Sequence, residues 1–268
     1  TRAMSRASPG NLAELWSSFP TVQPLLGPPL CAGAENVYID MGTNMGKHIT
    51  MLYHPSRFGY IGEYRNWFGS CGWADRGNKA KVCGNATEVR ERLASTCVMS
   101  FEPSPMHVPN LEGRFRDYRA EGTVFPAAGA RRLHFFSAAI AAHNSVETFH
   151  WTPGRGHDTG ASLARSSALI SSDTRLNASA VPTVSLSWLL KRHVPRNARV
   201  FAKMDIEGAE YTALPPAIPQ LCKYVDAMLL ELHDKHLKQT REHLKRHASE
   251  DDAAGRAAVQ ASHDALQQ

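Results

Sequence analysis

The sequence predicts an α/β fold with a doubly wound, mostly parallel sheet, and three segments carry this prediction. Each is an apolar run that ends in a carboxylate and leads into a turn: residues 37–40 end at Asp40, residues 97–102 at Glu102 and residues 200–205 at Asp205. Such runs are typical of strands that are buried on both faces of a parallel sheet. Because parallel strands end at one edge, the three carboxylates mark that edge as a polar ligand site.

The first segment, VYIDMGTNMGK, continues into a glycine-spaced loop. Gly42 and Gly46 let the backbone approach a ligand that a Cβ atom would keep away, and residues 47–52 suit a crossover helix. The spacing is G-x-x-x-G, whereas the dinucleotide fingerprint is G-x-G-x-x-G. On its own, this loop is equally consistent with an ordinary strand-to-helix turn.

The other two segments add functional groups to the same edge. Pro103 and Pro105 stop the second strand just after Glu102. In doubly wound folds, an acidic residue at this place accepts hydrogen bonds from ribose hydroxyls. The third segment carries Asp205 and Glu207 before a glycine turn, so that two carboxylates lie close together there.

The motifs IDMGTNMG, FEPSP and KMDIEGAE occur in this order within residues 36–233, and together they resemble the FkbM family of S-adenosylmethionine-dependent methyltransferases. MDIEGAE is the most family-specific of the three, whereas the glycine loop is shared by many methyltransferases. The resemblance implies a Rossmann-like methyltransferase fold and S-adenosylmethionine as the methyl donor. Composition alone indicates only a soluble α/β domain.

The resemblance also implies a donor site on these residues. Asp40 would support the ammonium group of the donor, Glu102 would hold the ribose hydroxyls, and the end of the third strand, within residues 132–140, would lie beside the adenine. A glycine- and serine-containing element at residues 160–163 matches the family loosely. The predicted donor-binding residues are Asp40, Gly42, Thr43, Asn44, Gly46, Glu102, Pro103, Ser137 and Ala138.

The acid-rich turn favours a hydroxyl group as the methyl acceptor. A neutral hydroxyl is a poor nucleophile, so a base must remove its proton. The predicted catalytic residues are Asp205, Glu207 and His233, which follows the fifth strand at residues 225–232. Enzymes that methylate nucleobase amines commonly carry an Asn/Asp-Pro-Pro-aromatic turn after the fourth strand, and this turn lacks it. We therefore predict O-methylation of a sugar, a glycan or a polyketide-like small molecule.

Several alternatives stay open at this stage. Lys203 alternates with Asp205 and Glu207, so the acids could form a structural ion pair. A divalent cation held by oxygen ligands is another use of such a turn, although we predict no metal site. A non-catalytic Rossmann-like binding module and a nicotinamide-dependent oxidoreductase are the alternative functions, the latter disfavoured by the glycine spacing.

Three regions follow from the pattern along the chain. Residues 1–35 form an N-terminal arm, residues 36–233 form the methyltransferase domain, and residues 234–268 form a charged helical tail. The domain carries an insertion at about residues 55–90, which contains Trp67 and Trp73 as a small subcore or an acceptor-binding platform. After His233 we find no apolar alternation for the antiparallel hairpin that usually closes this fold. We expect that hairpin to be missing or the sheet edge to be covered differently.

Charge and cysteine usage bear on partners and compartment. The net charge of +5 is mild and no nucleic-acid motif accompanies it, so we expect no nucleic-acid partner. No apolar run is long enough to span a membrane. The cysteines lack the spacing of a zinc site, whereas Cys71 and Cys83 could form a disulfide. Together with glycosylation sequons at Asn85 and Asn177, they lean toward a eukaryotic secretory lumen or secretion.

Overall fold

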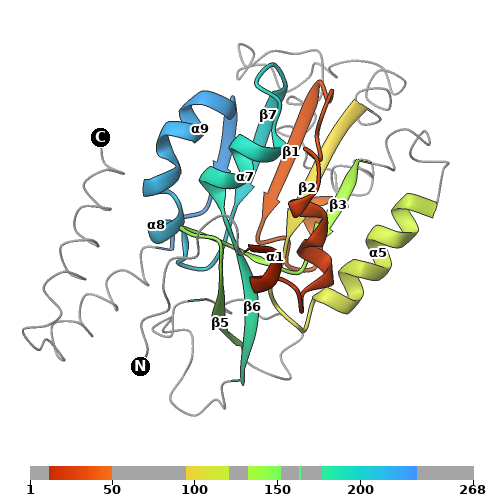
Figure 1. The fold of residues 1–268 in the computed structure, drawn as a ribbon, viewed down its shortest axis with the longest axis vertical. Helices are drawn as coiled ribbons and strands as arrows, with labels where there is room; N and C mark the ends of the chain where they lie inside the picture. Colours follow the sequence, from red (N-terminus) through yellow and green to blue (C-terminus); the bar gives the residue numbers. More distant parts are fainter. Residues whose placement is uncertain (1–11, 50–94, 121–131, 152–162, 164–176, 234–268) are drawn as a thin grey trace, which may run out of the picture.

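The computed structural model describes residues 12–49, 95–120, 132–151, 163 and 177–233. Its centre is a five-stranded parallel sheet in the order β3-β2-β1-β7-β8 (Figure 1). The strands are β1 (Asn36–Met41), β2 (Thr96–Phe101), β3 (Leu133–Phe136), β7 (Arg199–Met204) and β8 (Ala227–Leu230). The chain builds outward from β1 on both sides, so the strand order reverses between β1 and β7. The predicted Rossmann-like α/β fold is confirmed.

Side chains of the sheet alternate between two buried faces. Val37 of β1 belongs to the larger core cluster, and Val200 of β7 lies in register beside it on the same face. Tyr38 points to the opposite face, where its ring stacks on Phe201 with centroids 5.8 Å apart. Because both faces are covered, most residues of each strand are apolar, and the strands do not alternate regularly between apolar and polar residues.

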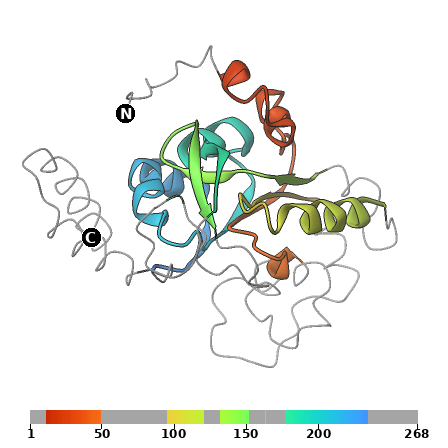
Figure 2. The same ribbon diagram turned by 90° about the horizontal axis from the view of Figure 1, so that it is seen from below.

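Helices cover both faces of the sheet. The described helices after β2 are α5 (Val108–Ala120), α7 (Leu186–His193), α8 (Glu210–Ala213) and α9 (Ile218–Tyr224), with a short turn of 3₁₀ helix at Pro215–Ala217. Phe115 of α5 packs on Phe135 with ring centroids 5.2 Å apart, on the face of Tyr38. Leu186 of α7 packs on the other face, and Figures 1 and 2 show α5 on the opposite side of the sheet from α7, α8 and α9.

The described part of the predicted N-terminal arm is built into the core. It contains α1 (Leu12–Leu15) and a 3₁₀ helix at Pro20–Leu26. Trp16 is fully buried, and its ring stands edge-on to that of Trp188 at 5.9 Å. Its Nε1 donates to the carbonyl oxygen of Ser145 at 3.2 Å. These contacts make residues 12–35 a cover for the sheet.

A second, three-stranded sheet lies beside the first. It consists of β4 (Ala139–Ala141), β5 (Ser145–Trp151) and β6 (Asn177–Ser185) in the order β4-β6-β5. The predicted single strand within residues 132–140 is therefore wrong in one respect. The N–H of Ala138 donates to the carbonyl oxygen of Phe136 at 2.9 Å, and this tight turn sends the chain from one sheet into the other. The strands predicted at residues 146–151 and 181–186 are confirmed as the antiparallel pair of β5 and β6.

A disulfide joins Cys31, which precedes β1, to Cys97 at the start of β2. Both cysteines are fully buried, and they are 66 residues apart in the sequence. Sequence reasoning missed this pair, because nothing in the spacing brings the two residues together. The predicted pair of Cys71 and Cys83 lies outside the described residues.

Other predictions also fall outside the described residues. One is the insertion at about residues 55–90, which contains Trp67 and Trp73. Another is the charged tail at residues 234–268, where the closing hairpin was expected to be missing. Within the part of the chain that the structure describes, β8 forms one edge of the five-stranded sheet. Among those same residues, no helix has both the length and the apolar character needed to cross a membrane.

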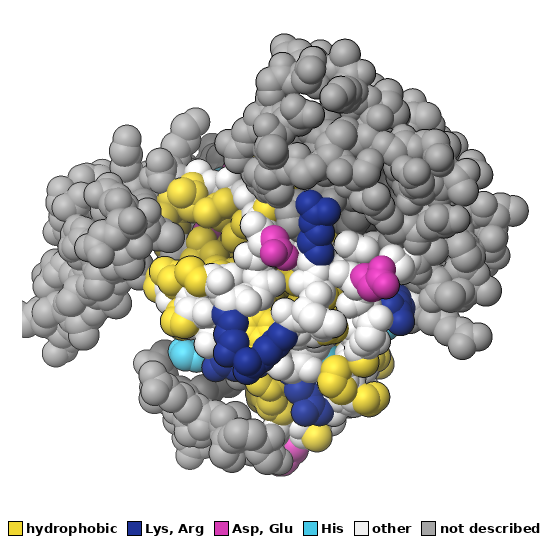
Figure 3. Space-filling view, turned by 90° about the horizontal axis from the view of Figure 1, so that it is seen from above, with side chains coloured by type: hydrophobic (Ala, Val, Ile, Leu, Met, Phe, Trp, Pro, Cys, Tyr) yellow, Lys and Arg dark blue, Asp and Glu magenta, His cyan; other side chains and the backbone are white. Residues whose placement is uncertain are grey.

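The end of the molecule at which the strands begin is rich in basic side chains. Figure 3 shows Lys and Arg gathered there, with acidic side chains among them. Basic residues on the segments that lead into β3, β7 and β8 include Arg132, Arg196, Arg199 and Lys223. The acidic ligand edge predicted from the sequence is at the opposite end of the strands, so the two charged surfaces are separate.

We predict that non-reducing peptide mapping will recover a peptide that links Cys31 to Cys97. Replacing both by Ala should lower the free energy of unfolding by about 2–5 kcal/mol, because the link restricts the unfolded chain. Cys222→Ala, which removes an exposed free thiol, is the control and should leave stability unchanged. A map in which Cys97 is free or joined to another cysteine would contradict this pairing.

Candidate active site

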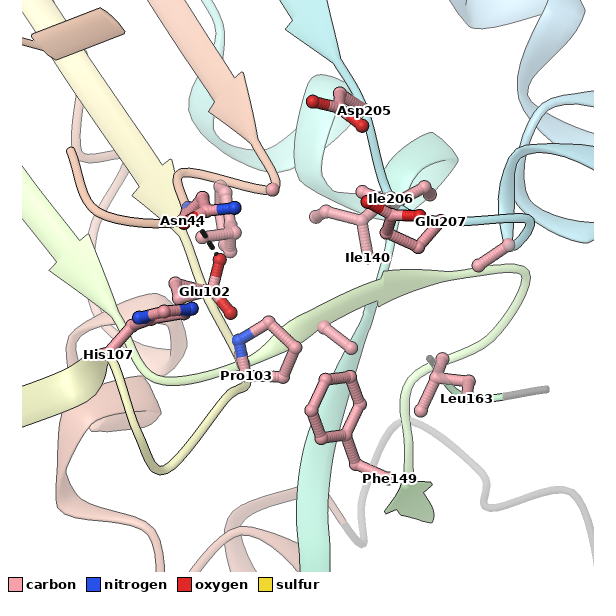
Figure 4. Close-up of a pocket in the computed structure, with 15 residues that line it drawn as sticks. Asn44, Glu102, Pro103, His107, Ile140, Phe149, Leu163, Asp205, Ile206 and Glu207 are labelled. Carbon is pink, nitrogen blue, oxygen red and sulfur yellow. Dashed lines mark hydrogen bonds between the residues drawn. The ribbon is translucent and has the colours of Figure 1, made fainter. Parts of the chain in front are cut away.

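A cavity opens at the edge where the parallel strands end, between the tips of β1 and β2 on one side and the tip of β7 on the other (Figure 4). Its lining combines polar groups with an apolar wall. The lining residues are Gly42, Asn44, Phe101, Glu102, Pro103, His107, Ala138, Ala139, Ile140, Phe149, Leu163, Asp205, Ile206, Glu207 and Ala209. Ligands of open α/β sheets bind at this edge, near the strands where the order reverses.

The loop after β1 is shaped by close contact with its neighbours. The N–H groups of Gly42 and Thr43 both donate to the carbonyl oxygen of Phe101 at 3.0 Å. Gly42 has φ = +80°, and a Cβ atom at this position would overlap the backbone carbonyl of Asp205. The sequence predicted that glycine is needed here for the approach of a ligand. In the structure, a side chain at Gly42 would collide first with the turn after β7, which belongs to the protein itself.

Glu102 extends from the end of β2 into the cavity, and each of its carboxylate oxygens accepts a backbone hydrogen bond. The N–H of Asn44 donates to one oxygen at 2.7 Å, and the N–H of Ser104 donates to the other at 2.9 Å. Burial raises the pKa of Glu102 to about 7, against the opposing effects of these two bonds and of the Lys203 charge. Glu102 is therefore fixed in place and titrates near neutral pH.

Asp40 has a partner inside the protein. Its carboxylate is fully buried, does not line the cavity, and lies 3.7 Å from Nζ of Lys203. Burial raises the pKa of Asp40, while the charge of Lys203 lowers it. The expectation that Asp40 faces the ligand is not met, because the side chain points to the sheet face that also carries Lys203.

Lys203 connects both sides of the cavity. Its Nζ donates to the carbonyl oxygen of Gly42 at 2.6 Å and lies 3.4 Å from a carboxylate oxygen of Asp205. Lys203 is thus an ion-pair partner of Asp40 and of Asp205 at once. The alternative interpretation of the sequence anticipated the pair with Asp205 but not the pair with Asp40. Lys203 fixes the position of Asp205 without removing this residue from the cavity lining.

The turn after β7 brings the three predicted catalytic residues together. His233 Nε2 lies 3.7 Å from Asp205 and 3.4 Å from Glu207. Glu207 has φ = 54°, a backbone conformation that non-glycine residues adopt rarely. Its neighbours on both sides, Ile206 and Gly208, donate their N–H groups to the carboxylate of Glu210 at 2.8 Å each. Glu210 therefore determines the shape of this turn.

Charge and burial shift both titrating groups of this turn. Burial raises the pKa of Glu207 to about 7, and the positive charge of His233 opposes this shift. Partial burial on its own lowers the pKa of His233, but the surrounding carboxylates of Glu210, Glu207 and Asp205 outweigh it and raise the pKa. His233 Nε2 and the Glu207 carboxylate are 3.4 Å apart, so the two groups are close enough to share a proton.

The structure thus sorts the predicted site residues into two groups. Those that line the cavity are Gly42, Asn44, Glu102, Pro103, Ala138, Asp205 and Glu207. Those that stand behind or beside the lining are Asp40, Thr43, Gly46, Ser137 and His233. Thr43 donates its hydroxyl to the backbone carbonyl of Asp40 at 3.3 Å, and Gly46 has φ = +75° close to Leu111 of α5, so both support the loop.

Sequence reasoning missed most of the apolar wall of the cavity. Figure 4 shows Phe149 and Leu163 below Pro103, with Ile140 between them and the acid-rich turn. Phe149 comes from β5, whose alternating pattern could have indicated an inward side chain but not the cavity it reaches. Leu163 is the one described residue of the loosely matching element at residues 160–163.

One group of side chains could also hold a cation. Ligand atoms of Asp205, Glu231 and His233 lie within 4.8 Å of one another. Glu231 is 67% exposed, and Lys203 already provides a positive charge beside Asp205. The absence of a metal site stays a prediction.

Known proteins that are similar to this chain are methyltransferases. A family model described as Methyltransferase FkbM domain matches residues 61–254. A solved structure, the methyltransferase FkbM from Methylobacillus flagellatus KT, aligns with 14% sequence identity and a TM-score of 0.33. The alignment covers 80% of this chain and 37% of that one, so this chain spans little more than a third of that protein's length. No curated protein matches the chain.

We predict that Gly42→Ala will lower the free energy of unfolding by more than Gly33→Ala does. Both positions have positive φ, which costs about 1–3 kcal/mol for a residue with a side chain. A Cβ atom at Gly33 would meet nothing within 4 Å, whereas one at Gly42 would overlap the Asp205 carbonyl. The difference between the two variants in chemical denaturation isolates this overlap. Equal destabilisation would mean that the loop and the turn after β7 are not in contact.

Proposed function

Because the chain belongs to the FkbM methyltransferase family, we propose that it transfers a methyl group from S-adenosylmethionine to a hydroxyl group of a sugar, a glycan or a polyketide-like small molecule. The observation that carries this proposal is the arrangement of one cavity between two sets of carboxylates. Glu102 stands at one side of the cavity, and Asp205 and Glu207 stand at the other side.

The cavity residues fit the methyl donor. Glu102 offers carboxylate oxygens to ribose hydroxyls, and Gly42 and Asn44 line the cavity where the amino-acid part would lie. Pro103 and Ile140 belong to the apolar lining that a flat adenine ring would contact. When bound, S-adenosylmethionine supplies a methyl group that is activated by the positive charge on its sulfur. The protein's task is then largely to position the acceptor in line with that methyl group.

The acid-rich turn fits a hydroxyl acceptor. Asp205 and Glu207 present carboxylate oxygens to the cavity, where they can accept a hydrogen bond from the acceptor and take up its proton. Lys203 holds Asp205, and His233 lies behind Glu207. The turn lacks the Asn/Asp-Pro-Pro-aromatic sequence that is common in enzymes that methylate nucleobase amines, so we propose oxygen as the atom that is methylated.

The disulfide supports a proposal about the compartment. Buried disulfides are rare in reducing compartments and common in secreted and lumenal proteins. The link between Cys31 and Cys97 therefore favours an oxidising environment, such as the eukaryotic secretory lumen or the cell exterior.

Two measurements test the proposed function together. Isothermal titration calorimetry with S-adenosylmethionine and with NAD should give saturable heat for the first ligand only. A tritiated-methyl transfer screen over glycans, polyketide alcohols and small phenols should then label one class through oxygen. Binding of NAD alone would favour an oxidoreductase, and donor binding without transfer to any acceptor would favour a non-catalytic binding module.

Glu102→Gln should weaken donor binding by about 1.5–3 kcal/mol, because a charge-assisted acceptor of the ribose hydroxyls is lost. In the wild-type protein, affinity should rise as pH increases through about 7, since the carboxyl then ionises. Calorimetry over this pH range measures both effects. The variant should lose this part of the pH dependence. Glu112→Gln, which removes an exposed carboxylate from α5, is the control and should bind the donor as the wild-type protein does. Equal affinities of the wild-type protein, Glu102→Gln and Glu112→Gln would refute the donor-site assignment.

Asp205→Asn should reduce turnover by about 100-fold or more while donor affinity and the fold persist, because the acceptor loses a charged hydrogen-bond partner. Asp226→Asn is the matched control, since Asp226 accepts the N–H of Val200 at 2.7 Å at the other end of β7. That variant should lose stability but keep its turnover. A chelator should leave the wild-type rate unchanged. An Asp205→Asn enzyme with most of its turnover would exclude a catalytic part for this residue.

A further inference from the structure

Glu210 is a fully buried carboxylate, and its side chain contacts the acid-rich turn and His233. One oxygen accepts the N–H of Ile206 and the other accepts the N–H of Gly208. The first oxygen also lies 3.1 Å from Nδ1 of His233. Because it is buried and does not line the cavity, Glu210 has no route to the substrate.

These contacts decide which nitrogen of His233 carries the proton. Two backbone donors hold Glu210 as an acceptor, so the ring nitrogen that faces it must donate. In the neutral imidazole, Nδ1 then carries the hydrogen and Nε2 keeps its lone pair. Nε2 faces the cavity side of the turn, with Glu207 at 3.4 Å and Asp205 at 3.7 Å. A buried carboxylate behind a histidine is a common way to fix ring orientation and tautomer.

We propose that Glu210, His233 and Glu207 form a proton relay, in which Glu210 is the positioning residue. The relay rests on the proposed function. Glu207, which lines the cavity, takes the proton of the acceptor hydroxyl, and Nε2 of His233 then accepts that proton from Glu207. The acceptor oxygen forms a bond to the methyl carbon, and the carbon–sulfur bond breaks with its electron pair remaining on sulfur. His233, whose side chain is 14% exposed, finally releases the proton to solvent.

The charges around the relay favour its protonated state. Among the described residues, the carboxylates that face His233 are those of Asp205, Glu207, Glu210 and Glu231, and the last lies 3.9 Å from Nε2. Lys203 stands on the far side of Asp205 at 3.4 Å and offsets part of the negative charge. Glu210 raises the pKa of both Glu207 and His233, although burial is the largest influence on each. The two groups titrate as a coupled pair, so a pH–rate profile reports the pair and not one residue.

The first test is a ¹⁵N nuclear magnetic resonance titration of the histidine rings in the wild-type protein, with the His233 signals assigned by their absence in His233→Asn. We expect the neutral ring to be the Nδ1–H tautomer and its titration to lie above that of free histidine. An Nε2–H tautomer would overturn the relay without any variant of Glu210. This readout needs neither donor nor acceptor.

The second test replaces Glu210 by Gln. Removing this negative charge should lower the apparent pKa values of the pair, so the rise of methyl transfer with pH should move to lower pH by about one unit. Glu231→Gln is the matched control, because its carboxylate is 67% exposed and screened by solvent, and it should move the profile far less. A Glu210→Gln enzyme that is slower but keeps the wild-type profile would overturn the relay, since a purely structural loss does not shift the profile.

The failure of the relay can be separated from the failure of the proposed function. Methyl transfer by a protein with the Nε2–H tautomer would overturn the relay alone. A protein that binds S-adenosylmethionine but methylates no hydroxyl would overturn the proposed function and the relay with it. If Glu210→Gln does not fold, the tautomer of the wild-type ring still decides the question.

Discussion

The buried ammonium group of Lys203 is the interaction on which the rest of the site depends. Among the described residues, Lys203 is the only lysine or arginine that is buried. A desolvated charge must be neutralised within the protein, and here Asp40 and Asp205 share that role. The same group also donates a hydrogen bond to the carbonyl oxygen of Gly42. Lys203 therefore ties the loop after β1 to the turn after β7, and the cavity lies at this junction.

The two sides of the cavity are stabilised by the same kind of interaction. In each, a glutamate accepts backbone N–H groups and thereby holds a residue with positive φ in place. Glu102 accepts the N–H of Asn44, which has φ = 51°, and Glu210 accepts those of the residues on either side of Glu207, which has φ = 54°. Such conformations are unfavourable without support and are common at functional sites. Both strained residues line the cavity, so the support given to them shapes the ligand site directly.

Much of the fold and the polar part of the site could be predicted from the sequence. Asp205 and Glu102 each follow an apolar strand directly, and strand ends in a parallel sheet meet at one edge. Contacts between distant segments could not be predicted, because they depend on packing and not on local pattern. The disulfide of Cys31 with Cys97 and the pairing of Asp40 with Lys203 are of this kind. The turn that ends β3 at Phe136 was not predicted either, for a different reason. The residues on both sides of this turn are apolar, so the sequence does not indicate that the strand ends there.

The most direct test of the account is a crystal structure of this protein with S-adenosylhomocysteine, the product that the donor leaves behind. The account predicts that the ribose hydroxyls lie within hydrogen-bond distance of Glu102, and that the sulfur faces the side of the cavity formed by Asp205 and Glu207. Gly42 and Asn44 should then flank the amino-acid part of the ligand. A nucleoside bound elsewhere on the molecule, or bound with its sulfur directed away from Asp205 and Glu207, would contradict the account.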